Sequence, residues 1–221
     1  MNIGLLVVTN GRDSLLSRTV ASAESRLVGQ FCSRVIHDDS ADPDHRVRLG
    51  EAYPDYTIIG ADRTLGFGGA INNAWEYLSQ LELDFVFHLE DDFLFNEDIP
   101  LDRLCAVLRA EPRVQQVALL RQPWNQEERT QGGLLRVRSH TYNDMSVDGV
   151  PIVAHRNFFT TNPSLYRHSL MRLGWPTGPS SEGVFGINLF RDPDVICSFL
   201  GTKADPPKVE HIGDYRTGML Y

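Results

Sequence analysis

Three adjacent carboxylates, Glu90, Asp91 and Asp92, directly follow an apolar segment at residues 85–89. If that segment is a strand, alternation places Glu90 and Asp92 on one side and Asp91 on the other. Three ionised carboxylates repel one another, and a bound divalent cation removes this conflict. Oxygen ligands suit Mn²⁺ or Mg²⁺, which usually keeps positions for phosphate oxygens. The acids are therefore a candidate metal site, and the simpler alternative is a solvated acidic loop.

The elements that must position these acids alternate along the first part of the chain. Continuous apolar runs predict buried strands, and apolar side chains every three or four residues predict helices. The expected strands cover residues 3–8, 31–37, 56–60, 85–89 and 114–120, and the expected helices follow residues 12, 69 and 99. This alternation predicts a parallel sheet with helices on both faces, with ligands at the carboxyl ends of the strands. Residues 9–12, 38–40 and 90–92 each follow a strand, so we expect them at one edge.

The rest of the chain has a weaker pattern, and we find no internal repeat and no clear second domain. We therefore expect one domain over residues 1–221, divided into halves at 1–121 and 122–221. Gly29 is expected to end the first helix. The other expected elements are loops at 41–48, 125–133 and 174–183, a strand or hairpin at 134–142, a short strand at 158–162, and a short helix at 164–173.

The apolar strand that ends in acids resembles the DxD-type motif of GT-A glycosyltransferases, particularly the family-2 type, with Glu at its first position. Three other segments match the same family in order. Residues 7–12 (VVTNGR) resemble the loop that receives the nucleotide base. Residues 35–40 (VIHDDS) resemble the strand ending whose Asp recognises the base. Residues 65–73 (LGFGGAINN) resemble the Gly- and Asn-rich turn beside the nucleotide. The resemblance implies an α/β, Rossmann-like three-layer GT-A fold with a central, mostly parallel sheet.

The resemblance also implies roles for individual residues. Asp92 is expected to contact the metal, and Glu90 and Asp91 are expected to contact ribose, sugar or metal-bound water. The residues expected to hold the nucleoside or to lie beside it are Thr9, Asn10, Arg12, Asp39, Gly66, Gly68 and Asn72. The implied reaction is metal-dependent transfer of a sugar from a nucleoside-diphosphate sugar to an acceptor hydroxyl, with inversion at the anomeric carbon.

Glu182 precedes an apolar run at residues 184–190, where a lone acid is usually an N-terminal helix acid. The resemblance gives Glu182 another role, the catalytic base that takes the acceptor proton in inverting GT-A enzymes. That family pattern has Asp at the next position, where this chain has Gly183. Residues 159–164 (FTTNPS) resemble the segment that lines the acceptor side.

His211 resembles the C-terminal histidine that many GT-A enzymes bring back to the metal. Imidazole and carboxylate together are a reasonable ligand set for Mn²⁺. A structural, hydrogen-bonding histidine is the ordinary alternative. Trp124, Trp175 and Tyr215 are candidates for stacking on sugar or base, and equally for packing in the core or at its rim.

Three other functions were weighed against this one. Gly66 and Gly68 hint at a dinucleotide fingerprint, but Ile71 stands where the third Gly belongs, and the turn follows the third strand rather than the first. A nucleotidyltransferase shares the metal-bound acids but needs a Gly-rich loop with a basic residue to hold a triphosphate, which the first strand lacks. A non-catalytic sugar-nucleotide-binding protein stays open because Gly183 replaces the Asp of the base motif.

The composition describes an ordinary globular protein, with 221 residues, 42% hydrophobic and 23% charged. The net charge of −8 argues against long-range attraction to nucleic acid or anionic membrane. A local basic groove remains possible from Arg109, Arg113, Arg121, Arg136 and Arg138.

Three distant cysteines, Cys32, Cys105 and Cys197, predict buried thiols in a reducing compartment. No run of about 18 apolar residues and no signal-peptide pattern is present, so we expect a cytoplasmic protein without a membrane span. The sequence leaves the acceptor open: a glycan, a protein side chain or a modified nucleic-acid base.

Overall fold

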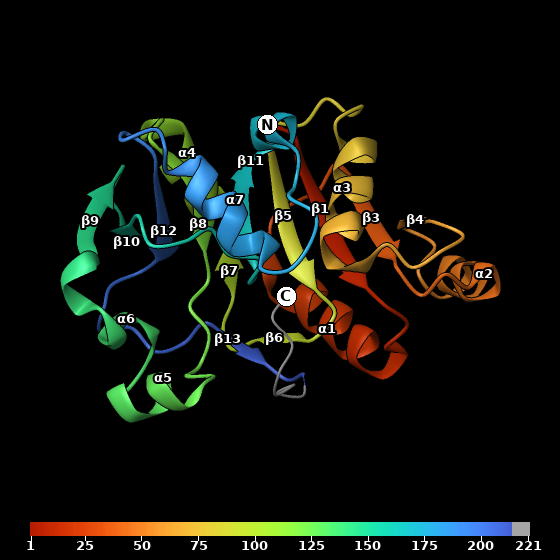
Figure 1. The fold of residues 1–221 in the computed structure, drawn as a ribbon, viewed down its shortest axis with the longest axis horizontal. Helices are drawn as coiled ribbons and strands as arrows, with labels where there is room; N and C mark the ends of the chain where they lie inside the picture. The colour runs from red at the N-terminus through yellow and green to blue at the C-terminus, as the bar shows by residue number, and fades with distance from the viewer. Residues whose placement is uncertain (214–221) are drawn as a thin grey trace.

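A nine-stranded mixed sheet forms the centre of the computed structural model, which describes residues 1–213 (Figure 1). In sheet order the strands are β4 (Thr57–Gly60), β3 (Ser33–Asp38), β1 (Ile3–Thr9), β5 (Phe85–Glu90), β11 (Ser164–Arg167), β8 (Val114–Ala118), β12 (Ile196–Leu200), β10 (Val150–His155) and β9 (Asn143–Val147). The strands from β4 to β5 are parallel, as are β8 and β12, whereas β11, β10 and β9 run antiparallel to their neighbours. The α/β sandwich expected from the sequence is confirmed.

Helices cover both faces of this sheet. They are α1 (Asp13–Arg26), α2 (Pro43–Ala52), α3 (Gly66–Leu78), α4 (Leu101–Ala110), α5 (Gln126–Gln131), α6 (Leu134–Val137) and α7 (Ser181–Leu189), with 3₁₀ turns η1 (Ser139–Thr141) and η2 (His168–Leu173). Side chains of α1, α2 and α4 pack with Leu5 and Val7 of β1 on one face. Side chains of α3 and α7 pack with Leu6 and Val8 on the other. Because successive side chains of a strand alternate, both faces of β1 are covered, and the strand is apolar up to Thr9, its last residue.

Two short ladders lie outside the main sheet. Strand β13 (Val209–His211) pairs antiparallel with β6 (Phe93–Phe95), and β2 (Leu27–Val28) pairs with β7 (Ile99–Pro100). The first ladder matters for the site, because it brings the C-terminal His211 beside the residues that follow β5. The helix α1 ends at Arg26, before the expected Gly29, because residues 27–28 leave the helix to form β2.

Two expected loops are helices instead, so these predictions are wrong. Residues 43–52 form α2, which Pro43 begins and which Asp42 caps by accepting a hydrogen bond from the backbone N–H of Asp44 at 2.9 Å. Residues 126–131 form α5, which Asn125 caps by accepting from the N–H of Glu128 at 2.9 Å. Both segments are polar and lack regularly spaced apolar residues, so only their capping residues indicated a helix in the sequence.

The expected order of elements between residues 134 and 173 is also wrong. Residues 134–137 form α6, and the hairpin lies later, at β9 and β10. Residues 158–162 form no strand, and the strand β11 occupies residues 164–167, where we expected the start of a helix. These elements are short, so the spacing of their apolar residues does not distinguish a strand from a helix.

Two of the three cysteines, Cys105 and Cys197, are buried as expected, but Cys32 is exposed. Within residues 1–213, no helix combines the length and the apolar character that crossing a bilayer requires.

Candidate active site

The polar residues that follow β1, β3 and β5 meet at one edge of the sheet, as expected. The three strands are parallel and in register, so Thr9 lies opposite Asp38 and Val8 lies opposite Glu90. Antiparallel β11 begins at the same edge, because Ser164 pairs with His88. Segments from both halves of the chain therefore converge on the acids.

Asp91 points toward the loop after β1, where it is fully buried and heavily bonded. Its carboxylate accepts from the hydroxyl of Thr9 at 2.6 Å and from the guanidinium of Arg12, which also forms an ion pair with it. Its backbone carbonyl accepts from the hydroxyl of Thr19 at 2.8 Å. Burial still raises the pKa of Asp91, against the opposing effects of Thr9 and Arg12. These contacts fix the acidic segment to the loop where we expected the nucleoside.

Asp92 lies between two cationic or potentially cationic side chains. Its Oδ2 is 2.8 Å from a guanidinium nitrogen of Arg12, and its Oδ1 is 3.2 Å from Nε2 of His211. Burial opposes ionisation, but the neighbouring side chains of His211 and Arg12 outweigh it and hold the pKa of Asp92 below its ordinary value. The expected meeting of Asp92 and His211 is thus present, and Arg12 contacts the acids rather than standing apart from them.

Glu90 lines a cavity of about 310 Å³ together with Glu182 and His211. Burial and the nearby charges of Asp92, Glu182 and Asp91 raise the pKa of Glu90. Clustered acids of this kind are hard to keep ionised together without a cation, which is the electrostatic conflict expected from the sequence.

The donor atoms around Asp92 fit a divalent cation. Its Oδ1 is buried and receives no hydrogen bond of ordinary geometry from a described residue, and it lies next to the Nε2 of His211. Hard carboxylate oxygen with one imidazole nitrogen suits Mn²⁺. Within residues 1–213, no group of three or more His, Cys, Asp or Glu side chains forms a complete metal site. Two protein ligands leave room for ligands from a substrate and water.

Asp39 holds the start of α3. Its two carboxylate oxygens accept from the backbone N–H groups of Leu65 at 2.7 Å and of Gly66 at 2.9 Å. Gly66 has a φ of +69°, a conformation that side chains disfavour. Asn10, by contrast, is exposed on the loop after β1. Asp39 therefore has a structural partner, and nucleoside binding by Asp39 and Asn10 stays a prediction.

Gly68 and Asn72 pack α3 against the loop that leads to α7. The side chain of Asn72 donates to the carbonyl of Trp175 at 2.6 Å and accepts from its N–H at 2.8 Å. A Cβ on Gly68 would lie 2.6 Å from the carbonyl oxygen of Pro176. The structure thus gives both residues a packing role, and their expected place beside a nucleotide stays a prediction.

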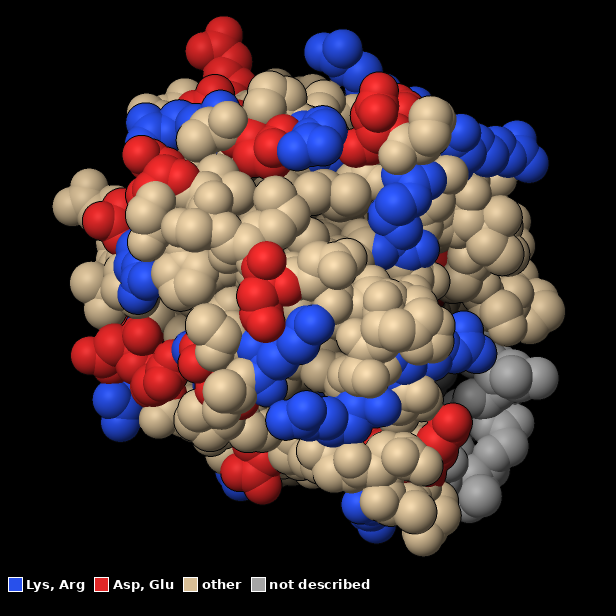
Figure 2. Space-filling view, turned by 90° about the vertical axis from the view of Figure 1, so that its left-hand side faces the viewer, with Lys and Arg blue, Asp and Glu red and all other residues tan. Residues whose placement is uncertain are grey.

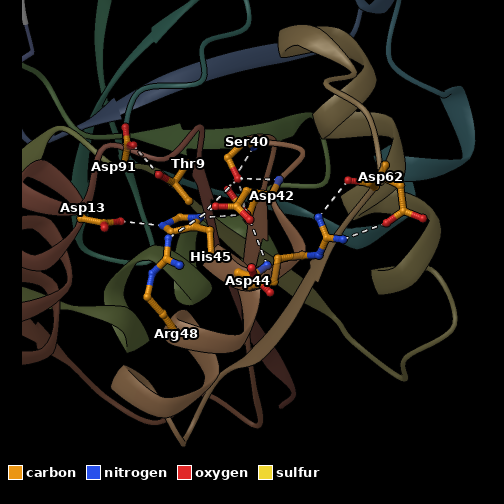
Figure 3. A network of polar contacts seen from close by, with 12 residues as sticks. Thr9, Asp13, Ser40, Asp42, Asp44, His45, Arg48, Asp62 and Asp91 are labelled. Carbon is orange, nitrogen blue, oxygen red and sulfur yellow. Dashed lines mark hydrogen bonds and ion pairs between the residues drawn. The ribbon is translucent and has the colours of Figure 1, made fainter.

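A polar network holds the segment after β3 (Figure 3). The ring of His45, on α2, lies 2.6 Å from Asp13 and 3.0 Å from Asp38, and the hydroxyl of Ser40 donates to Asp38 at 2.7 Å. Burial opposes protonation of His45, but Asp13 and Asp38 outweigh it and raise its pKa. This network joins α1, α2 and β3 next to Asp39, and sequence reasoning missed it because it missed α2.

Glu182 lies in the first turn of α7 and points at the segment before β11. Its Oε1 accepts from the backbone N–H of Thr161 at 2.7 Å and from the Thr161 hydroxyl at 3.2 Å. Burial raises the pKa of Glu182, although the bonds from Thr161 and Thr160 oppose this effect. A carboxylate with a raised pKa facing a cavity can act as a general base near neutral pH.

Gln116 on β8 fixes the segment that holds Glu182. Its amide donates to the carbonyl of Thr160 at 2.6 Å and to the hydroxyl of Ser164 at 2.9 Å, and it accepts from the N–H of Thr160 at 3.1 Å. Gln116 is only 1% exposed. A polar residue inside a predicted buried strand was the available signal, and neither Gln116 nor Thr161 was singled out from the sequence.

The three aromatic candidates have different positions. Trp124 lines the cavity beside His211. Trp175 is buried in the core cluster between α3 and α7, and Tyr215 lies outside the described residues. Stacking on a substrate therefore stays a prediction for Trp124, whereas core packing accounts for Trp175.

Two of the five arginines expected to build a basic groove are held in ion pairs. Arg113 contacts Glu111 at 2.7 Å, and Arg121 contacts the buried Glu128 at 2.6 Å. On the face that carries β9 and α6, Lys and Arg side chains lie interspersed with Asp and Glu (Figure 2). Arg136 on α6 is exposed and can still contribute to a local basic groove.

Solved structures with the same architecture include a mannosyltransferase and a protein solved with a sugar nucleotide. One is the mannosyltransferase PcManGT from Pyrobaculum calidifontis in complex with GDP-Man and Mn²⁺, with a TM-score of 0.65, 17% identity, and coverage of 99% of this chain and 58% of that one. Another is S. aureus TarS 1-349 in complex with UDP-GlcNAc, with a TM-score of 0.65, 16% identity, and coverage of 99% of this chain and 60% of that one.

These similarities establish that the chain has the GT-A fold, as the sequence motifs predicted. The chain spans about three-fifths of the length of these neighbours. No protein-family model matches the sequence, and no curated protein matches it either.

Proposed function

We propose that this protein is a metal-dependent glycosyltransferase that moves a sugar from a nucleoside-diphosphate sugar to an acceptor hydroxyl with inversion. The observation that carries the proposal is the composition of one cavity. Glu182 and Glu90 line it together with His211, whose Nε2 lies 3.2 Å from Asp92. The candidate base and one member of the candidate metal pair, His211, thus line the same cavity of about 310 Å³. The fold is that of glycosyltransferases solved with GDP-Man and UDP-GlcNAc.

Asp92 and His211 would hold Mn²⁺ or Mg²⁺. Bound there, the cation would supply Lewis-acid stabilisation of the negative charge on the departing diphosphate. Arg12 contacts both Asp91 and Asp92, so its guanidinium neutralises part of the acidic cluster beside the expected diphosphate. Thr9, Asn10 and Asp39 are proposed to hold the nucleoside at the adjoining edge of the sheet.

Glu182 would act as the general base. Its carboxylate takes the proton of the acceptor hydroxyl as the acceptor oxygen forms a bond to the anomeric carbon of the sugar. The bond between that carbon and the diphosphate oxygen breaks, and the diphosphate leaves with the bonding electron pair. In-line attack from the side opposite the leaving group inverts the anomeric centre. The acceptor is proposed as a glycan, a protein side chain or a modified nucleic-acid base.

The test is turnover of sugar nucleotides by wild type and by Asp92→Asn. Wild type is incubated with Mn²⁺ and either GDP-mannose or UDP-GlcNAc, and release of the nucleoside diphosphate is measured. We expect Asp92→Asn to reduce turnover by about 10³-fold, since a metal interaction contributes several kcal/mol to the transition state. Asp98→Asn is the matched control, because that carboxylate is exposed and pairs with Arg26 at the surface.

The same assay separates the rival functions. Release of pyrophosphate from a nucleoside triphosphate and a sugar phosphate would instead indicate a nucleotidyltransferase. Stabilisation by a sugar nucleotide without turnover would indicate a binding protein. Turnover by Asp92→Asn equal to that of wild type would remove the metal assignment.

A further inference from the structure

The segment 121–128, called here the strap, follows β8 and includes the first residues of α5. Among the described residues, its Gln122 makes side-chain hydrogen bonds to His211. We propose that Gln122 in this strap is a positioning residue that fixes the imidazole of His211 on Asp92. This inference rests on the proposed function, since it concerns how the proposed metal ligand is held. Sequence reasoning did not single out Gln122.

The ladder that carries His211 is short and has weak support of its own. Strand β13 has three residues, and His211 is its last, opposite Phe93 of β6. The backbone N–H of Ile212 donates to the carbonyl of Asp92 at 2.8 Å, which ends the ladder. Short two-stranded ladders are marginal alone, so the position of the imidazole must depend on contacts from other segments.

The other edge of β13 is closed by the chain that leaves β8. Both Lys208 and Val209 donate their backbone N–H groups to the carbonyl of Leu120, at 2.8 and 3.3 Å, and Arg121 forms a parallel bridge with Val209. At Gln122 the backbone pairing with β13 stops, and the side chain of Gln122 makes the hydrogen bonds instead. The carboxamide of Gln122 donates to the carbonyl of His211 at 2.8 Å and accepts from its N–H at 2.9 Å.

Two aromatic rings pack against the imidazole. Phe93 is stacked on His211 with 4.7 Å between ring centroids and 20° between planes, and Trp124 of the strap lies at 4.0 Å and 47°. The backbone is thus held by Gln122 and the ring by Phe93 and Trp124. The outcome is the 3.2 Å separation between Nε2 of His211 and Oδ1 of Asp92.

The strap is itself held by several hydrogen bonds to one buried carboxylate, so it can serve as a reference for His211. The buried carboxylate of Glu128 accepts from Arg121 at 2.6 and 3.0 Å and from the N–H of Trp124 at 2.8 Å. It also accepts from the side chain of Asn125 at 3.0 Å. Burial opposes ionisation of Glu128, but the bonds from Arg121 and Trp124 outweigh it and lower its pKa, so the carboxylate stays charged and its bonds persist.

The geometry assigns Gln122 a role that can be measured without turnover. Residues that orient a metal ligand typically contribute about 10–100-fold to metal affinity. Gln122→Met keeps the length of the side chain and removes both hydrogen bonds to His211. Gln126→Met is the matched control, because Gln126 is exposed on α5 and its bonds are to Thr130 rather than to His211.

The experiment is a titration of each protein with Mn²⁺ in the presence of UDP or GDP, with free Mn²⁺ followed by electron paramagnetic resonance. We expect Gln122→Met to weaken Mn²⁺ binding by about 10–100-fold, and Gln126→Met to bind as wild type does. The melting temperature without Mn²⁺ is measured alongside. A purely structural role would lower that temperature and leave the Mn²⁺ affinity of the folded protein unchanged, which would overturn the inference.

His211→Ala separates this inference from the proposed function. If wild type binds Mn²⁺ and His211→Ala does not, the metal assignment is supported, and equal binding by Gln122→Met then overturns the inference alone. If wild type fails to bind Mn²⁺ with either nucleotide, or His211→Ala binds it as wild type does, the metal assignment and the inference both fail.

Discussion

The two halves of the molecule hold their candidate site residues in different ways. In residues 1–121 the acids follow parallel strands, and their place is set by the register of β1, β3 and β5. In residues 122–213, Glu182 and His211 sit on short elements that are placed by side-chain bonds from Thr161 and Gln122. The strands that set the backbone register also form the core of the protein, whereas a side-chain hydrogen bond holds one residue in place. Substitutions in the first half should therefore cost stability together with function, and those in the second half function alone.

Glu182→Gln should produce the largest effect on function in the second half. The amide cannot accept a proton at neutral pH, so transfer to the acceptor should fall by about 10²–10⁴-fold. Donor binding should change much less than turnover, since the hydrogen bonds of Glu182 in the described residues come from Thr161. Steady-state turnover and donor affinity are to be measured together. Glu51→Gln is the control, because Glu51 is exposed at the end of α2.

The pH profile of wild type sharpens this prediction. Burial raises the pKa of Glu182, and the base works only when ionised. Activity should thus be lost as pH falls, with a midpoint above the ordinary value for a glutamate. Glu182→Gln should lack that acid limb. Turnover of Glu182→Gln within threefold of wild type would show that another group takes the proton.

Asp39→Ala should produce the largest effect on stability in the first half. It removes the two bonds that the carboxylate accepts from the N–H groups of Leu65 and Gly66 at the start of α3. A hydrogen bond to a charged group contributes about 1.5–3 kcal/mol, but Gly66 is exposed and water can replace its bond, so we expect the free energy of unfolding to fall by about 1–3 kcal/mol. Urea unfolding measures it, with the exposed Asp55→Ala as control. A stability equal to that of wild type would contradict the contrast between the halves.

Thr161→Val tests whether a substitution in the second half lowers turnover more than stability. It removes the hydroxyl that donates to Glu182 at 3.2 Å and keeps the backbone N–H that donates at 2.7 Å. We expect turnover to fall by about tenfold, or about 1.4 kcal/mol, with a smaller change in stability. The lost hydroxyl bond favoured the charged form, so the pKa of Glu182 rises further and the acid limb moves to higher pH.

Thr57→Val provides the matched control for that variant, since Thr57 is exposed on β4. An acid limb at the wild-type position would show that the Thr161 hydroxyl does not tune the base.

The same difference between the halves explains how much the sequence could predict. The first half has long apolar runs with polar residues at their ends, so strands 3–9 and 85–90 and the acids 90–92 follow from period and position. The helix α2 was missed because it is polar and its signal is a cap at Asp42.

In the second half the elements are short and their order depends on long-range bonds. Gln116 bonds to Thr160, 44 residues away, and Gln122 bonds to His211, 89 residues away. No local pattern encodes such pairings. The resemblance to a family supplied Glu182 and His211 as candidates, but the residues that orient them needed the structure.

Sensitivity to acid is the property in which the halves should be alike, so it gives the smallest expected difference between them. His88 in β5 and His155 in β10 are buried, and burial lowers their pKa values to about 4 and about 3. The unfolded chain binds protons at these histidines below about pH 6.5, while the folded protein does not. Stability is therefore complete above that pH and is lost as pH falls, by about 1.4 kcal/mol per pH unit for each histidine.

His155→Phe tests this, because its ring already packs among Tyr142, Phe158 and Phe199. We expect the free energy of unfolding, measured with urea between pH 6 and pH 4, to depend less steeply on pH in this variant than in wild type. The difference in slope should correspond to about one proton. His140→Gln, which changes an exposed histidine, should keep the wild-type slope. An unchanged slope in His155→Phe would mean that the folded protein protonates His155 at an ordinary pH, which requires water or a counter-charge to reach the interior of the second half.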